Sequence, residues 1–268
     1  MTYSIEAKEL RIGKGVRIGE GVNISCSGGT AEKIVIGDGV YLGHHIEVDC
    51  PIVEIGDYTM IREYTQILGN KKCEIGSCCW IGQYCIINST ANLRIGNGVG
   101  IGAHSQLWTH IRFGDTLQGC KWDDDKEMLI EDDVWFVGHC LVSPIHAKRK
   151  SMAMLGSVIT KDMEENHIYA GVPAIDVTEK LGTQYEDVSV DQKYTIMNKK
   201  LEEFYKINPQ YSRSITVVKK WTKKQDPNVT YFNVSDRTYV KRLTEEEIEF
   251  MKFLLMKIKF YPKSFIIT

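Results

Sequence analysis

Large apolar residues recur every six positions through much of the first 178 residues. They fall into five groups of three: Ile36, Leu42 and Val48; Ile55, Ile61 and Ile67; Ile75, Ile81 and Ile87; Ile95, Ile101 and Leu107; Ile130, Phe136 and Val142. A period of six matches neither the turn of a helix nor the simple alternation of one strand. It is typical of a solenoid in which each unit forms one short strand and one corner, so that three units complete a triangular coil.

This pattern predicts side chains that point inward and stack on their equivalents in neighbouring coils. Glycine follows many of them and suits tight corners, as at Gly37, Gly43, Gly56, Gly76, Gly82, Gly96 and Gly102. Burial of one Val, Leu or Ile side chain contributes about 1.5–3 kcal/mol, so such columns can organise a domain. A β-sandwich is the alternative, but its strands would recur at about 8–12 residues rather than as phased triplets.

The repeat stops at residues 111–128, IRFGDTLQGCKWDDDKEM, and then resumes. This segment is rich in Gly and Asp and has no six-residue phase, so we expect a loop extruded between two coils. Long insertions of this kind usually serve function. His110 stands immediately before it, and histidine titrates near neutrality, which makes His110 a candidate general base. The alternative is a surface or hydrogen-bonded histidine without a catalytic role.

Two segments carry a resemblance to a known family. LIEDDVWFVGHCLVSP (129–144) and GSVITKDMEENHIYAGVPA (156–174) resemble the closing signature of the left-handed β-helix hexapeptide acyltransferases. The resemblance covers roughly residues 10–178. It implies a left-handed parallel β-helix, a homotrimer with active sites between subunits, acyl-CoA as co-substrate and no metal. Glu131 and Val137 replace expected glycines, and IHAKRKSMAML (145–155) replaces a regular coil, so we expect the last coil to be distorted.

The same resemblance suggests where ligands bind. It gives His110 the position of a base at a coil edge, before a loop that reaches a neighbouring subunit, and makes the Gly138 N–H the donor to the oxyanion. It places acyl-CoA along Gly138, Gly156, Ser157, Lys161, Gly171, Pro173 and Ala174.

Other side chains near these positions have two interpretations each. Trp108 and Trp122 could stack on a base or a sugar ring, whereas Trp135 fits the coil itself. The basic run 148–150 either neutralises CoA phosphates or forms a solvated edge.

Residues 179–268 leave the repeat and predict a small α/β domain. Helical patterns cover 191–207 and 244–260, the second opened by a capping box of Thr244 and Glu247. Strand patterns cover 213–221, 228–234 and 237–243, the last two as a hairpin. A tail of this kind is similar to that of nucleotide-sugar N-acyltransferases. The alternative is a domain that caps the solenoid or supports assembly.

Composition excludes several classes of function. The 268 residues are 43% apolar with a net charge of −2, so nothing favours nucleic acid. The apolar stretch 250–267 is interrupted by Lys252, Lys257 and Lys259, and the first residues lack a signal-like apolar segment, so we expect a cytoplasmic protein without a membrane span. Four of the eight cysteines, Cys73, Cys78, Cys79 and Cys85, lack paired C-x-x-C spacing and are expected in the core rather than at a zinc ion.

Taken together, these features predict a β-solenoid (1–178, with the extruded loop 111–128) followed by an α/β domain (179–268). The expected activity is acyl transfer from CoA to the amino group of a nucleotide-linked amino sugar, in bacterial surface-polysaccharide synthesis. An amine that binds as the free base would need no protein base. The first alternative is O-acetylation of a sugar or antibiotic hydroxyl. The second is a β-helix protein that is not an acyltransferase, of the carbonic-anhydrase-like kind.

Overall fold

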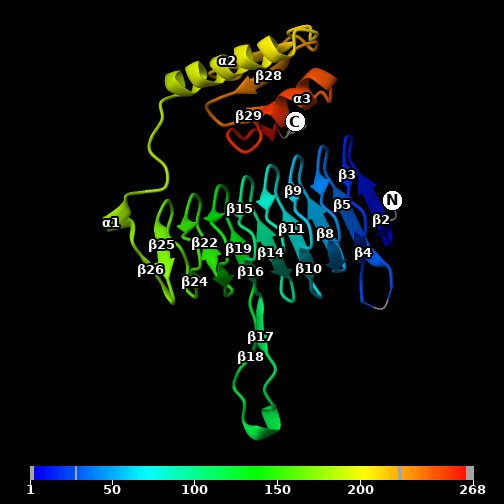
Figure 1. Cartoon of the computed structure of the whole chain (residues 1–268), viewed down its shortest axis with the longest axis vertical. Coiled ribbons are helices and arrows are strands. Elements are labelled where there is room, and N and C mark those ends of the chain that lie inside the picture. Colours follow the sequence, from blue (N-terminus) through cyan, green and yellow to red (C-terminus); the bar gives the residue numbers. More distant parts are fainter. Residues whose placement is uncertain (1–2, 28, 223–224, 264–268) are drawn as a thin grey trace. The chain divides into compact units, whose positions relative to one another are not determined.

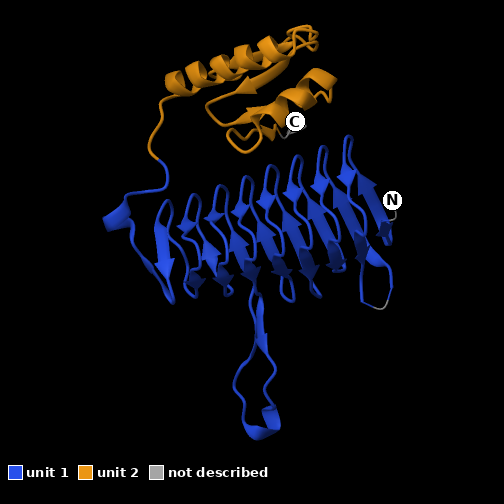
Figure 2. Cartoon of the chain, in the orientation of Figure 1, with its two compact units in different colours: residues 1–185 blue, residues 186–268 orange. Residues whose placement is uncertain are grey.

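A computed structural model describes residues 3–27, 29–222 and 225–263 and divides the chain into two compact units, 1–185 and 186–268 (Figure 2). The sequence pattern placed the boundary after residue 178. The short helix α1 (Thr178–Leu181) and the residues up to 185 therefore belong to the first unit.

The first unit is a three-sided parallel β-helix (Figure 1). Sheet A contains β1 (Ser4–Ile5), β4 (Asn23–Ser25), β7 (Glu47–Asp49), β10 (Gln66–Leu68), β13 (Ile86–Asn88), β16 (Gln106–Leu107), β21 (Leu141–Val142) and β24 (Val158–Ile159). Sheet B contains β2 (Ala7–Ile12), β5 (Ala31–Ile36), β8 (Ile52–Ile55), β11 (Lys72–Ile75), β14 (Leu93–Ile95), β19 (Met128–Ile130) and β22 (His146–Ala147). Sheet C contains β3 (Arg17–Ile18), β6 (Tyr41–Leu42), β9 (Met60–Ile61), β12 (Trp80–Ile81), β15 (Gly100–Ile101), β20 (Trp135–Phe136), β23 (Met152–Ala153), β25 (Ile168–Gly171) and β26 (Ala174–Asp176). The chain visits the three sheets in turn, so the predicted fold class is confirmed.

The fifteen residues of the repeat form three columns inside this prism. In sheet B, Ile36, Ile55, Ile75, Ile95 and Ile130 are successive register partners. In sheet C the column is Leu42, Ile61, Ile81, Ile101 and Phe136, and in sheet A it is Val48, Ile67, Ile87, Leu107 and Val142. All fifteen side chains are buried in one core. The six-residue period thus predicted both the burial and the register.

The coil expected to be distorted is regular. Ala147, Ala153 and Ile159 stand six apart and continue the three columns in register. Both alanines are fully buried, and Ala153 is the register partner of the large Phe136. A small side chain beside a large one keeps the columns filled. The register is therefore kept although Glu131 and Val137 stand at corners where glycine was expected.

The extruded segment forms an arm at the corner between sheets A and B (Figure 1). Strands β17 (His110–Arg112) and β18 (Asp123–Asp125) pair antiparallel, and the 3-10 turn η1 (Thr116–Gln118) lies at the tip. Arg112 contacts Asp123 and Asp125 at 3.2 and 2.6 Å across the hairpin. Large apolar side chains on the arm are exposed, namely Ile111, Phe113, Leu117 and Trp122.

The second unit is an α/β layer, as the tail pattern indicated. Helices α2 (Val190–Ile207) and α3 (Glu245–Leu254) accompany a four-stranded sheet of β27 (Ile215–Val218), β28 (Thr230–Asn233), β29 (Thr238–Tyr239) and β30 (Tyr261–Pro262). Strands β28 and β29 form the expected hairpin. Met197, Leu201 and Phe204 of α2 are buried.

Two details of α3 differ from the sequence pattern. Thr244 accepts from the Glu247 N–H, but the Glu247 carboxylate accepts from the backbone of Arg242 and Leu243 instead of completing the capping box. The helix also ends at Leu254, before the expected residue 260, because the chain turns back there. This turn buries Phe260 and pairs Tyr261 with Thr238.

Within the described residues, no helix combines the length and apolar character needed to cross a membrane. Residues 264–267 of the apolar stretch lie outside the described residues.

The columns generate a prediction for stability. Ile81 is fully buried, so Ile81→Ala should lower the free energy of unfolding by about 2–5 kcal/mol through lost contacts and a cavity. Ile12→Ala, at a position 44% exposed, should cost about 1 kcal/mol or less. Urea denaturation followed by circular dichroism measures both. Equal losses for the two variants would contradict the column as the main source of stability.

Candidate functional site

His110 lies at the base of the arm, where the chain leaves the β-helix. Strand β16 ends at Leu107, and β17 begins at His110, whose register partner is Asp125. The Lys126 N–H donates to the Thr109 carbonyl at 3.0 Å and closes the base of the hairpin. The half-buried His110 side chain is therefore held by both the coil and the arm.

The buried Asn88 orients the His110 ring. Asn88 Oδ1 lies 3.1 Å from the Thr90 backbone N–H and 3.0 Å from His110 Nδ1. A backbone N–H can only donate, so the atom it meets is the amide oxygen, and Nδ1 must carry the proton that this oxygen accepts. The Thr109 hydroxyl donates to the same oxygen at 2.8 Å. Nε2 of the neutral ring then has a free lone pair, as a general base requires.

An apolar hollow lies beside His110. It has a volume of about 210 Å³ and is lined by Trp108, His110, Ile111, Leu141, Val142, Ser143, Pro144 and Val158. The Trp108 ring meets the His110 ring edge-on at 5.6 Å, and its Nε1–H donates to Gln106 Oε1 at 3.1 Å. Leu141 and Val158 are neighbours on sheet A. This hollow suits an apolar or acyl group close to the histidine.

Gly138 lies at the other corner of sheet A. Its φ is +150°, and among the described residues no acceptor is recorded for its N–H. Gly138 is level with Ala103 in the sheet register, so residues 104–109 lie between its level and His110. The extended part of this segment, residues 105–109, spans about 16 Å at about 3.3 Å per residue. Gly138 and His110 of one chain therefore do not face the same reacting atom.

Gly156 and Ser157 follow Gly138 at the same corner, one coil further on. The Gly156 N–H donates to the Gly138 carbonyl at 2.9 Å. The Ser157 hydroxyl is buried, and within the described ranges it has no hydrogen-bond partner. In the preceding coils the equivalent hydroxyls of Thr65 and Ser105 accept from the next coil, at Cys85 and Cys140. Ser157 immediately precedes β24, the last strand of sheet A, so no further strand of this sheet follows to donate to it.

The remaining predicted ligand contacts surround the last coil. Lys161 is exposed. Gly171 pairs with Ala174 in a tight antiparallel hairpin that contains Pro173. Trp122 lies apart from them on the arm and is 70% exposed. The structure thus places Trp108 beside His110 and groups Gly138, Gly156 and Ser157, but it does not bring all the predicted residues into one site within a single chain.

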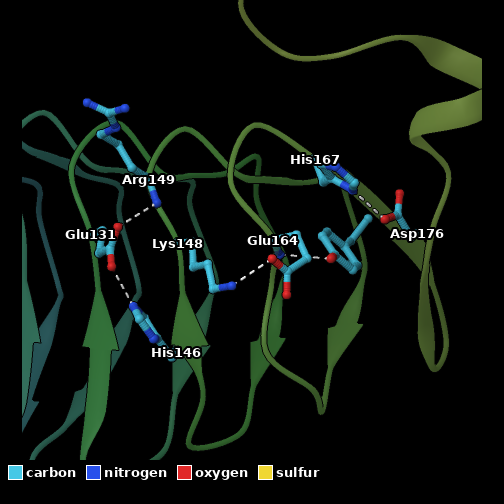
Figure 3. A network of polar contacts seen from close by, with 8 residues as sticks. Glu131, His146, Lys148, Arg149, Glu164, His167 and Asp176 are labelled. Carbon is cyan, nitrogen blue, oxygen red and sulfur yellow. Dashed lines mark hydrogen bonds and ion pairs between the residues drawn. The ribbon is translucent and has the colours of Figure 1, made fainter.

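Two residues of the basic run 148–150 are paired with acidic side chains, and Figure 3 shows one of these pairs, Lys148 with Glu164. Lys148 Nζ lies 2.6 Å from Glu164, which raises the pKa of Lys148, and Arg149 lies 2.6 Å from Glu165. Lys150 Nζ lies 5.3 Å from the centre of the Tyr185 ring. The solvated-edge interpretation fits these contacts better than a phosphate site does.

Glu131, at a position where the motif resemblance led us to expect glycine, has its own partners (Figure 3). Its carboxylate contacts His146 Nε2 at 2.6 Å and accepts from the Arg149 N–H at 2.9 Å. Burial would raise the pKa of Glu131, but these hydrogen bonds outweigh it and lower the pKa. Glu131 therefore fastens two coils together at the corner after sheet B.

The clustered cysteines Cys73, Cys78, Cys79 and Cys85 are buried free thiols, as expected of core residues. Burial raises the pKa of Cys85 to about 11. In the part of the chain that the structure describes, no group of three or more His, Cys, Asp or Glu side chains is placed to hold a metal ion.

Sequence reasoning missed Asn88, Leu141 and Val158. The sequence did contain the information that places Asn88. Ile87 and Leu107 belong to one column, so the residue after Ile87 must lie beside the residue after Leu107, close to His110. The column pattern was used only for apolar residues. The outward positions Leu141 and Val158 gave no such signal.

Comparisons with known proteins found solved structures of low similarity. No family model matches the chain. Among solved structures, AntD, an N-acyltransferase from Bacillus cereus in complex with dTDP and 3-hydroxybutyryl-CoA, is 15% identical over 65% of this chain and 91% of AntD, with a TM-score of 0.48. The polySia-specific acetyltransferase NeuO is 18% identical over 77% of this chain and 98% of its own, with a TM-score of 0.44. A maltose O-acetyltransferase from Clostridium difficile 630 is 18% identical over 57% of this chain and 70% of its own, with a TM-score of 0.38. Similarities this distant decide neither the acceptor nor the chemistry, which have to be derived from the site.

The contact with Asn88 generates a prediction for the His110 tautomer. In nitrogen–proton correlation spectra of histidine-labelled protein, neutral His110 should carry its proton on Nδ1. His44 is an internal control, because its Nδ1 accepts from the Glu20 N–H at 3.1 Å and its proton must be on Nε2. Asn88→Asp should keep the Nδ1–H form of His110, whereas Asn88→Leu should lose this preference. An Nε2–H form of His110 in the unaltered protein would contradict the assignment.

Proposed function

We propose that this chain is a CoA-dependent acyltransferase that acylates the amino group of a sugar.

 The observation that carries acyl transfer, whether to an amine or to a hydroxyl, is His110, whose tautomer is fixed by Asn88 and whose ring lines an apolar hollow at the base of the arm. The motif resemblance in residues 129–174 supports acyl-CoA as the co-substrate.

The proposed reaction needs one proton acceptor and one oxyanion donor. The acceptor nitrogen attacks the thioester carbonyl, a C–N bond forms, and the C–S bond breaks. His110 Nε2 takes the proton that the attacking group loses and then gives it to the leaving sulfur. Its Nδ1–H stays bonded to Asn88 throughout, which stabilises the charged ring. The Gly138 N–H would donate to the oxyanion.

These roles require two chains. His110 and Gly138 lie at opposite corners of sheet A, so they can act on one carbonyl only if each comes from a different subunit. The exposed apolar side chains of the arm support such an assembly, because Phe113 and Leu117 are 103% and 92% exposed in the single chain. We infer a homotrimer with its active sites between subunits.

The acceptor is proposed to be a nucleotide-linked amino sugar. The α/β unit of residues 186–268 supports this, since such a tail resembles that of nucleotide-sugar N-acyltransferases. A cytoplasmic role in bacterial surface-polysaccharide synthesis follows from that substrate class and is part of the same proposal.

A second candidate function is O-acetylation of a sugar hydroxyl. The fixed tautomer of His110 favours it, because a hydroxyl must lose its proton to attack, whereas an amine that binds as the free base does not.

A melting-shift screen tests the proposed function. Acyl-CoAs and nucleotide sugars are offered to the full chain singly and in pairs. A ligand at 100 times its Kd should stabilise the protein by about 2.7 kcal/mol and raise the melting temperature. Turnover with a stabilising pair is then measured by release of free thiol. No shift with either ligand class would remove the proposal.

Replacement of His110 separates the two acceptors. His110→Asn should lower kcat by about 10²–10⁴-fold for a hydroxyl acceptor, with an unchanged oligomeric state and melting temperature. His44→Asn, at a histidine away from the arm, is the control and should leave kcat unchanged. Near-normal turnover of an amine by His110→Asn would remove the base role and indicate attack by an unassisted amine.

A further inference from the structure

One corner of the β-helix carries a column of stacked rings. His45, Tyr64, Tyr84, His104 and His139 occupy equivalent positions in five successive coils, between sheets C and A. Neighbouring ring centroids are 5.1, 5.0, 5.1 and 4.8 Å apart, with interplanar angles of 19°, 3°, 6° and 23°. The spacing follows the distance of about 4.7–4.9 Å between neighbouring strands. Each coil therefore places one ring directly on the next.

All five residues have a left-handed backbone, with φ between 49° and 61°. Side chains other than glycine rarely adopt this conformation, and the ring contacts offset its cost. Glycines occupy the equivalent position at both ends of the column, Gly21 with φ 70° and Gly156 with φ 72°.

The two ends of the column differ. A Cβ added to Gly21 would lie 2.3 Å from His45 Nδ1, so the His45 ring covers Gly21 and closes that end. Apart from its chain neighbours Leu155 and Ser157, a Cβ added to Gly156 would meet no atom within 4 Å. The Gly156 N–H donates to the Gly138 carbonyl, which keeps this coil in register with the column. His139 is exposed, and because the next position of the column is Gly156, no ring of the column covers the outer face of the His139 ring.

We propose that a nucleobase stacks on His139 in this open position above Gly156. A flat ring there would continue the column at the same spacing of about 5 Å, and base-on-ring stacking needs no particular base edge. The exposed Leu155 adds an apolar neighbour, with its Cδ1 only 3.3 Å from where a Cβ of Gly138 would be.

The inference rests on the proposed function, because both of its substrates carry a nucleobase. The base is either the adenine of CoA or the base of the sugar nucleotide. In the first case the adenine of CoA, rather than its pantetheine arm, lies over Gly156. CoA would then lie in the opposite direction along the β-helix from the one that the family resemblance implies. In the second case the acceptor and the thioester meet near Gly138.

Calorimetric titration of the full-length protein tests the stacking. The probes are 3′-phosphoadenosine 5′-phosphate, 4′-phosphopantetheine, dTDP and UDP. His139→Asn removes the ring but keeps a residue that tolerates the left-handed backbone. His45→Asn makes the same change at the closed end, where φ is 53° compared with 49° at His139.

The expected result is that His139→Asn weakens the base-bearing probe by at least about fivefold, the lower limit for loss of one stacked base. His45→Asn should leave its affinity unchanged, and 4′-phosphopantetheine should bind both variants alike. Weakening of the adenosine probe alone assigns the position to CoA, whereas weakening of dTDP or UDP assigns it to the acceptor.

Gly156→Tyr provides a second test, because Tyr64 and Tyr84 adopt a similar backbone in the same column. Its ring should fill the open position and weaken the same probe, while Gly156→Asn should weaken it less. Base-bearing probes that bind His139→Asn as tightly as the unaltered protein would overturn the stacking and leave the proposed function intact. A protein that binds no acyl-CoA and no nucleotide sugar would overturn both.

Discussion

The contact on which this structure depends is the stacking of one buried side chain on its equivalent in the next coil. Each coil contributes three such side chains, and each is held by neighbours above and below, as Ile81 is by Ile61 and Ile101. The parallel strands between them are only two or three residues long in many places, so the ladder hydrogen bonds of one coil are few. Burial of the columns supplies the stability that the short strands cannot supply. It also fixes the register between coils, and with it the position of every corner residue.

The candidate site follows from that register. Because Ile87 and Leu107 are partners, Asn88 lies within hydrogen-bond distance of Thr109 and His110. The oxygen of Asn88 gathers donors from two coils and leaves His110 with one free nitrogen. The corner opposite presents Gly138 with an unengaged N–H, among the residues described. One rigid core thus sets the proposed base and the proposed oxyanion donor at separate edges, and the proposed trimer would bring them together.

Much of the β-helix could be predicted from the sequence, because a repeat of six places a large apolar residue at the same inward position of every coil. The arm could also be located, since the phase is lost at Ile111 and regained by Ile130. The regular coil at Ala147 and Ala153 could not, because the pattern was read from large side chains and the alanines fill their columns beside Phe136. The end of α3 at Leu254 was missed because burial of Phe260 outweighs a helical stripe that continues beyond it. Asn88 was missed because its role depends on a contact between coils.

At the corner between sheets A and B, the number of residues that connect two strands can change without changing the register of the core. Leu93 pairs with Cys73 on one side and with Met128 on the other, although the arm intervenes only on the second path. Closing a longer loop costs little, roughly 0.6 kcal/mol for each doubling of its length. The arm can therefore be lengthened, shortened or rewritten with almost no penalty in folding, and the proposed site at its base can change on a scaffold that stays the same.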